Sequence, residues 1–141
     1  TEILTYVDIH GITGEYKEIN AKHVQSRVAR KINKKIIVAD TPEARQFFAN
    51  QNTPYTEVKF IKNFPSQFKT ALELYDGTVF LLTLAEQKQI GCLIKDPHIY
   101  DTQRMIFEFL WQMAQPTTEQ PNPEEQNKTN SDQTASVATP A

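Results

Sequence analysis

The order of apolar and polar residues predicts a chain that alternates strands and helices before turning to hairpins. Residues 3–9 are apolar on both faces, as in a buried strand. Apolar residues at helical spacing predict a helix over about 15–33, and a second short buried strand is expected at 36–39. Residues 40–43 combine an N-cap side chain, an early proline and an early acid, which indicates a helix start.

Short strands joined by tight turns are expected in the second half. Asp76-Gly77 separates apolar runs at 72–75 and 78–84 and is a strong signal for a two-residue hairpin. A further strand is expected over 90–95, and Asp96-Pro97 caps a final helix that ends near residue 114. The predicted order is β-α-β-α-β-β-β-β-α. It indicates an α/β fold with packed helices and a mixed β-sheet, parallel at the front and antiparallel at the back.

Composition divides the chain near residue 114. All aromatic residues lie before this point, whereas 115–141 contains only four apolar residues, namely Ala135, Val137, Ala138 and Ala141. Such a segment cannot bury enough apolar surface to offset the entropy of ordering it. We therefore predict one folded domain over residues 1–114 and a disordered polar C-terminal tail over 115–141.

Charge and cysteine content exclude several protein classes. The folded part has 14 Lys and Arg against 13 Asp and Glu, so it is not a broadly basic nucleic-acid binder. No apolar run approaches the ~20 residues of a membrane span. Cys92, the only cysteine, excludes an internal disulfide framework and is expected to be a core thiol in a cytoplasmic protein. The start on Thr1, directly before a strand-like run, suggests a fragment of a longer protein.

The chain carries no recognisable catalytic or metal-binding motif. None of His10, His23 and His98 has the spacing of a zinc site or an activated nucleophile. Gly11 and Gly14 lie between a strand and a helix but lack the rest of a phosphate loop, so turn punctuation explains them better than anion binding. We expect no catalytic residue, metal ion or cofactor.

Basic residues form a stripe near the end of the first long helix. At about 100° per residue, Arg27, Arg30 and Lys34 cluster on one side, away from Val24 and Val28. The stripe lacks interleaved aromatic residues. A solvated helix face therefore explains it better than contact with the phosphates of a nucleic acid.

The last helix has more apolar residues than one sheet-facing stripe requires. Four residues supply such a stripe: Ile99, Ile106, Leu110 and Met113. Phe107, Phe109 and Trp111 lie beyond it. Either a bent sheet or the first helix covers them, or they anchor another subunit. We predict the second alternative, a homodimer interface.

A small-molecule site is predicted where the parallel strands end. Ligands collect outside the carboxyl ends of parallel strands in open α/β sheets, and these ends lead into residues 10–16 and 40–45. The second loop opens a helix whose free N–H groups favour an anion, although Asp40 opposes one. The candidate ligand-binding residues are His10, Thr13, Thr41 and Arg45. The alternative is that residues 40–42 are only a helix cap.

Four segments resemble the TrmB-like transcriptional regulators. They are 39–47 (ADTPEARQF), 75–79 (YDGTV), 91–97 (GCLIKDP) and 101–111 (DTQRMIFEFLW), in the family's order and spacing. The similarity covers roughly residues 1–114 and corresponds to the family's central domain, whose fold is similar to half a phospholipase D. The resemblance implies effector response and dimerisation. It also implies that DNA is bound only through an N-terminal winged helix missing from this sequence.

Phospholipase D activity does not follow from the resemblance. The reaction uses H-x-K-x-x-x-x-D, in which His takes the phosphoryl group and Lys holds its oxygens. The residues two positions after the histidines are Ile12, Gln25 and Tyr100. We predict a non-catalytic regulatory and dimerisation domain of a TrmB-like regulator, with an unidentified small-molecule effector and no membrane contact. The alternatives are a free-standing small-molecule-binding module and a degenerate phospholipase D-like enzyme.

Overall fold

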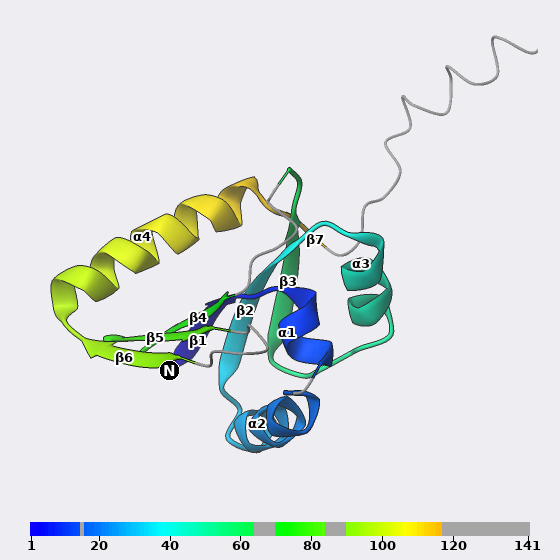
Figure 1. The fold of residues 1–141 in the computed structure, drawn as a ribbon, viewed down its shortest axis with the longest axis horizontal. Coiled ribbons are helices and arrows are strands. Elements are labelled where there is room, and N and C mark those ends of the chain that lie inside the picture. The colour runs from blue at the N-terminus through cyan, green and yellow to red at the C-terminus, as the bar shows by residue number, and fades with distance from the viewer. Residues whose placement is uncertain (15, 64–69, 84–89, 117–141) are drawn as a thin grey trace, which may run out of the picture.

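A seven-stranded mixed sheet organises the fold, with its strands in the order β6-β5-β4-β1-β2-β3-β7 (Figure 1). The computed structural model describes residues 1–14, 16–63, 70–83 and 90–116. Three central strands are parallel: β1 (Glu2–Tyr6), β2 (Asn33–Ala39) and β3 (Thr56–Ile61). Antiparallel strands extend the sheet at both edges: β4 (Thr70–Tyr75), β5 (Thr78–Thr83) and β6 (Gly91–Lys95) beyond β1, and β7 (Gln115–Pro116) beyond β3.

This arrangement confirms the predicted α/β class and the mixed sheet, with two local differences. Helix α2 (Lys17–Ala29) forms within the predicted helix over 15–33, and a short additional helix, α1 (Ile9–Thr13), forms where the end of the first strand and a glycine turn are expected. The carboxylate of Asp8 caps α1 by accepting a hydrogen bond from the His10 backbone N–H at 2.8 Å. Gln115 and Pro116, predicted to open the tail, instead pair with β3, and the rest of the predicted tail lies outside the described residues.

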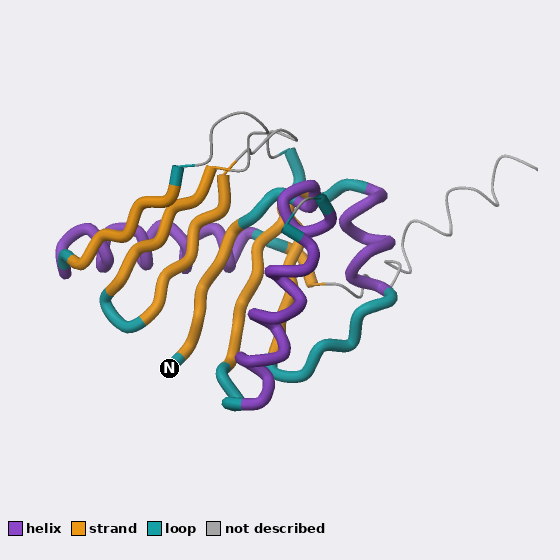
Figure 2. Tube along the Cα trace, turned by 60° about the horizontal axis from the view of Figure 1, so that its bottom comes forward, coloured by secondary structure: helices purple, strands orange, loops and turns teal. Residues whose placement is uncertain are grey.

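Helices lie on both faces of the sheet but cover them unequally. Figure 2 shows α4 (Pro97–Met113) behind the sheet, whereas α1, α2 and α3 (Pro42–Ala49) lie on the other face, beside the parallel strands. This placement follows from the right-handed β-α-β crossover, because two successive crossovers in the same direction put their helices on one face. None of the described helices lies in front of β4, β5 and β6 (Figure 2).

The predicted turn and both predicted helix starts are present. Asp76 and Gly77 have φ angles of 44° and 75°, so both central residues of the β4–β5 turn adopt the left-handed conformation of a tight hairpin. The Thr41 hydroxyl caps α3 by accepting from the Ala44 N–H at 3.2 Å. The Asp96 carboxylate caps α4 by accepting from the Ile99 N–H at 2.9 Å.

The packing of α4 corrects the predicted orientation of this helix. Phe107 is only 1% exposed and lies between Tyr6 and Trp111, with ring centroids 6.3 Å and 5.8 Å away. It belongs to the core between α4 and the sheet, so it is not available as a partner anchor. Ile99, Ile106 and Met113, expected to pack on the sheet, are exposed.

Two further findings concern the surface of the described part of the chain. Cys92 is exposed, contrary to the expected core thiol, because β6 is an edge strand with only β5 beside it. Within the described residues, no helix is long and apolar enough to cross a membrane.

Candidate ligand-binding cavity

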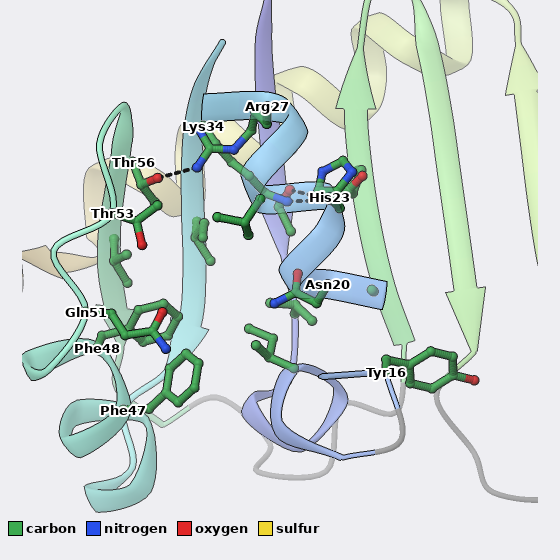
Figure 3. A pocket seen from close by; sticks show the side chains of 18 of the residues that line it. Tyr16, Asn20, His23, Arg27, Lys34, Phe47, Phe48, Gln51, Thr53 and Thr56 are labelled. Atoms are coloured by element: carbon green, nitrogen blue, oxygen red, sulfur yellow. Dashed lines mark hydrogen bonds and ion pairs between the residues drawn. The ribbon is translucent and has the colours of Figure 1, made fainter. Parts of the chain in front are cut away.

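A cavity of about 430 Å³ lies between α2, the α3–β3 segment and the sheet face opposite α4 (Figure 3). Strands β1, β2 and β3 form its floor, and it extends over β4 and β5 through residues such as Glu73 and Phe80. The volume falls within the range of roughly 300–1,000 Å³ that is usual for small-molecule sites. This cavity is therefore the candidate binding site.

One end of the cavity is apolar. Phe47 and Phe48 reach it from α3 (Figure 3), while Val7 and Ile12 reach it from the segment after β1. The Phe47 and Phe48 rings pack edge-to-face with centroids 5.0 Å apart, and Phe48 packs in the same manner on the buried Phe60. We call Val7, Ile12, Phe47 and Phe48 the apolar end.

The opposite end contains a buried guanidinium. Arg27, in the last turn of α2, is 3% exposed. Its Nη1 donates to the carbonyl oxygens of Ile32 at 2.7 Å and Tyr55 at 2.8 Å, and its Nη2 donates to the Thr56 hydroxyl at 2.5 Å. The Nε atom is buried and has no hydrogen-bond partner among the described residues. Three of the five guanidinium N–H groups of Arg27 thus donate to neutral acceptors, and the buried Nε–H has no partner among the described residues.

An ion pair between Lys34 and Glu73 lies beside Arg27. The Lys34 Nζ and the Glu73 Oε1 are 2.5 Å apart, on β2 and β4, and thereby span the intervening strand β1. The Thr5 hydroxyl on β1 donates to the same Glu73 oxygen at 3.4 Å. Burial acts to raise the pKa of Glu73, but the charge and the hydrogen bond of Lys34 outweigh it and hold the pKa below its ordinary value.

His23 reaches the same end of the cavity as Arg27 and, like Arg27, comes from α2 (Figure 3). Burial lowers the pKa of His23, and the positive charge of Lys34 lowers it further, which favours the neutral imidazole. Arg27 and Lys34 against Glu73 leave one net positive charge. We call Arg27, Lys34, Glu73 and His23 the cationic end.

None of the four ligand-binding residues predicted from the sequence lines this cavity. The His10 Nδ1 lies 2.7 Å from the Asp8 carboxylate, and the Thr13 hydroxyl donates to the Ile9 carbonyl at 3.1 Å. Thr41 is occupied as the cap of α3. The Arg45 guanidinium donates to both carboxylate oxygens of Asp40, at 2.6 Å and 2.9 Å, and lies 4.6 Å from the centre of the Phe60 ring.

The carboxyl ends of β1 and β2 enclose only a water-sized space. A cavity of about 10 Å³ lies there, bordered by Asp8 and Ala39 among others. The hydrogen bond from Arg45 is the main cause of a lowered pKa at Asp40, which keeps that carboxylate charged beside the loop. The larger space lies instead over the face of the sheet, where Thr5 of β1, Ile36 of β2 and Val58 of β3 line it.

Sequence patterns do not single out Arg27, Lys34 and Glu73 as site residues. A partial signal exists for Glu73, because its neighbours Leu72 and Leu74 are buried and alternation places Glu73 on the opposite face. The basic stripe predicted on α2 places Arg27 on a solvated face, whereas the structure buries it. Its acceptors belong to segments that follow α2, so helical periodicity alone does not reveal them.

Comparisons with known proteins support the fold. No family model matches the chain, and no curated protein matches it. Among solved structures, the chain is similar to TrmBL2, described as an archaeal chromatin protein with a novel mode of DNA binding, with a TM-score of 0.52 and 19% identity. The match covers 82% of this chain and 45% of TrmBL2, so the chain spans less than half the length of that protein. At this identity, the similarity shows a shared fold.

The described residues contain no group of three or more His, Cys, Asp or Glu side chains that could hold a metal ion. The residues that line the cavity can form hydrogen bonds, make ionic contacts and pack against apolar groups. These are the interactions of reversible ligand binding.

Proposed function

We propose that this chain is the regulatory domain of a TrmB-like transcriptional regulator, a half-phospholipase D fold that self-associates and binds an effector. The observation that carries the proposal is the fold shared with TrmBL2 over 82% of this chain but 45% of that DNA-binding protein. The four sequence segments that resemble the regulator family support the same conclusion. DNA contact then belongs to a module outside this sequence.

The cavity supplies the effector site in this proposal. Its walls come from α2, from the α3–β3 segment and from the sheet, so a bound molecule would contact all three. A ligand that binds one arrangement of these elements better than another shifts the population between them. This is the physical requirement for an effector response.

The exposed side of α4 supplies the self-association surface. Met105, Phe109 and Met113 are 66%, 63% and 62% exposed and follow one another at intervals of four residues. Ile99 and Ile106 lie beside them on the same side. Regulators that bind palindromic operators need twofold symmetry, and one helix packed against its copy provides it. Of the three anchors predicted from the sequence, Phe109 remains fully on this surface.

A fusion protein tests the regulatory role directly. Residues 1–116 joined to a repressor DNA-binding head that requires dimerisation are expected to repress a reporter gene through a palindromic operator. The Phe109→Ser variant is expected to lose repression and to sediment as a monomer, because a polar side chain replaces the central apolar contact of the stripe.

The matched control is Glu108→Ser, which alters the neighbouring exposed residue, about 100° around α4 from Phe109. This variant is expected to repress and to sediment like the parent fusion. A folded parent fusion that neither represses nor dimerises would contradict the proposal, and equal behaviour of the two variants would exclude the α4 stripe as the interface.

We further propose that the chain does not catalyse phosphodiester hydrolysis, which the alternative phospholipase-like function requires. The support is the absence of H-x-K after His10, His23 and His98. Incubation with bis(p-nitrophenyl) phosphate is expected to release no more nitrophenol than buffer does. Turnover that one His→Ala substitution abolishes would favour the enzyme instead.

A further inference from the structure

We propose that the cavity binds a monocarboxylic acid with an aromatic or aliphatic body. The carboxylate is placed at Arg27 and His23, and the body extends toward the apolar end. This inference rests on the proposed effector role of the cavity and adds the chemical class of the ligand.

The buried charge of Arg27 is the first argument. A guanidinium withdrawn from water is costly unless an anion or a full set of acceptors compensates it. Arg27 has only neutral acceptors among the described residues, and its Nε–H is unpaired. Glu73 makes its direct ion pair with Lys34, and its charge, which also acts on Arg27, does not outweigh the effect of burial on the pKa of Arg27. An anionic ligand supplies the missing compensation.

The charge of the site selects a monoanion. The cationic end carries one net positive charge, and the Glu73 carboxylate forms part of it. A phosphate dianion would exceed that charge, and Glu73 would repel it more strongly than it repels a monoanion. A carboxylate matches it, and neutral His23 can donate a second hydrogen bond from its ring.

The rest of the cavity indicates the size and the apolar character of the remainder of the ligand, here called its body. Ile36 and Val58 line the floor of the cavity, and Phe80 and Leu82 line it on β5, where Phe80 pairs with Glu73. Phe47 and Phe48 offer ring faces and edges for an aromatic group (Figure 3). A small acid without a body would leave these surfaces uncovered, so acetate is too small to exploit the site.

Calorimetric titration of the full chain at pH 7 tests the ligand class with three matched probes. 3-Phenylpropionate is expected to bind one molecule per chain. 3-Phenylpropanamide, which keeps the body but lacks the charge, is expected to bind roughly tenfold more weakly or worse, the usual effect of losing a charge-assisted hydrogen bond. Acetate, which keeps the charge but lacks the body, is expected to bind more weakly than 3-phenylpropionate by at least the same factor.

Three variants locate the site. Arg27→Gln is expected to reduce affinity for 3-phenylpropionate roughly tenfold or more and to remove the preference for acid over amide. Arg104→Gln, which removes a guanidinium from exposed α4, is expected to leave both unchanged. Since Arg27 also holds neighbouring carbonyls, Asn20→Trp provides an independent check. It fills the cavity from α2 (Figure 3), keeps Arg27 and is expected to abolish binding.

Nuclear magnetic resonance supplies a direct readout at the guanidinium. Addition of 3-phenylpropionate is expected to shift the Arg27 Nε–H resonance and to leave that of Arg104 in place. Equal affinity for acid and amide, equal effects of Arg27→Gln and Arg104→Gln, or no binding of any probe would overturn the inference. Each of these results leaves the fusion test of self-association unaffected, so the two proposals fail separately.

Discussion

Phe107→Ala is expected to lower the free energy of unfolding by about 3–5 kcal/mol, the usual cost of truncating a buried Phe. The side chain is fully enclosed between α4 and the sheet, where it packs with Leu72, Leu74 and Val79 in one core cluster. Its removal leaves a cavity and also removes two ring contacts, with Tyr6 and Trp111. Urea denaturation at a fixed protein concentration measures the loss.

Phe109→Ala is the matched control on the same helix. Because Phe109 is 63% exposed, its truncation is expected to change the stability of the folded monomer by no more than about 0.5 kcal/mol. The two variants should have the opposite effects on self-association. In sedimentation experiments, Phe109→Ala is expected to weaken association and Phe107→Ala to retain it. If Phe107→Ala dissociated the assembly without destabilising the fold, Phe107 would be the partner anchor predicted from the sequence.

Glu73→Gln is expected to destabilise the protein by about 3–5 kcal/mol at pH 7, because it leaves the charge of Lys34 buried without its partner. The double variant Lys34→Met, Glu73→Gln is expected to recover most of this loss, since neither buried charge remains. Chemical denaturation of the wild type, both single variants and the double variant measures the coupling between the two side chains.

The same pair makes the stability depend on pH in a defined direction. The pKa of Glu73 is lowered in the folded protein, so its contribution to stability is present above the unfolded pKa of 4.5 and is lost as the pH falls through the folded value. The stability difference between wild type and Glu73→Gln is therefore expected to be constant near neutrality. It should shrink as the pH drops below 4.5.

The exposed pair of Arg104 and Glu108 is the control. Its atoms lie 2.9 Å apart, but both side chains are more than half exposed, so water and salt screen the interaction. Glu108→Gln is expected to cost less than about 0.5 kcal/mol. Equal losses for Glu73→Gln and Glu108→Gln would contradict the assignment of a buried, stabilising pair.

The sequence by itself determined the features that depend on neighbouring residues. The hairpin at Asp76 and Gly77 follows from backbone preferences at two positions, and the caps at Thr41 and Asp96 follow from side chains that reach the next turn of their own helix. The apolar runs determined which segments became strands and in which order. The mixed sheet then followed from the short links between later strands and the helical links between earlier ones.

Only the tertiary structure decided which side of α4 is buried. The apolar residues of this helix cover much of its circumference, so periodicity favoured Ile99, Ile106 and Met113 as the core side. In the structure, Phe107 and Ala114 are buried against the sheet. The sequence allows either side of α4 to be buried because both sides are apolar. The strands on which α4 packs determine which side is buried, and most of these strands are distant from α4 along the chain.

The candidate site was decided in the same manner. Arg27 is fixed partly by the carbonyl of Tyr55, 28 residues away, and Lys34 meets Glu73 across 39 residues. Local pattern predicts a charged residue on a strand or helix to be solvated, since isolated charges avoid burial. The partners that compensate the burial of Arg27 and Lys34 come together only when β1, β2, β3 and β4 assemble. The cavity and its charge are therefore properties of the assembled sheet.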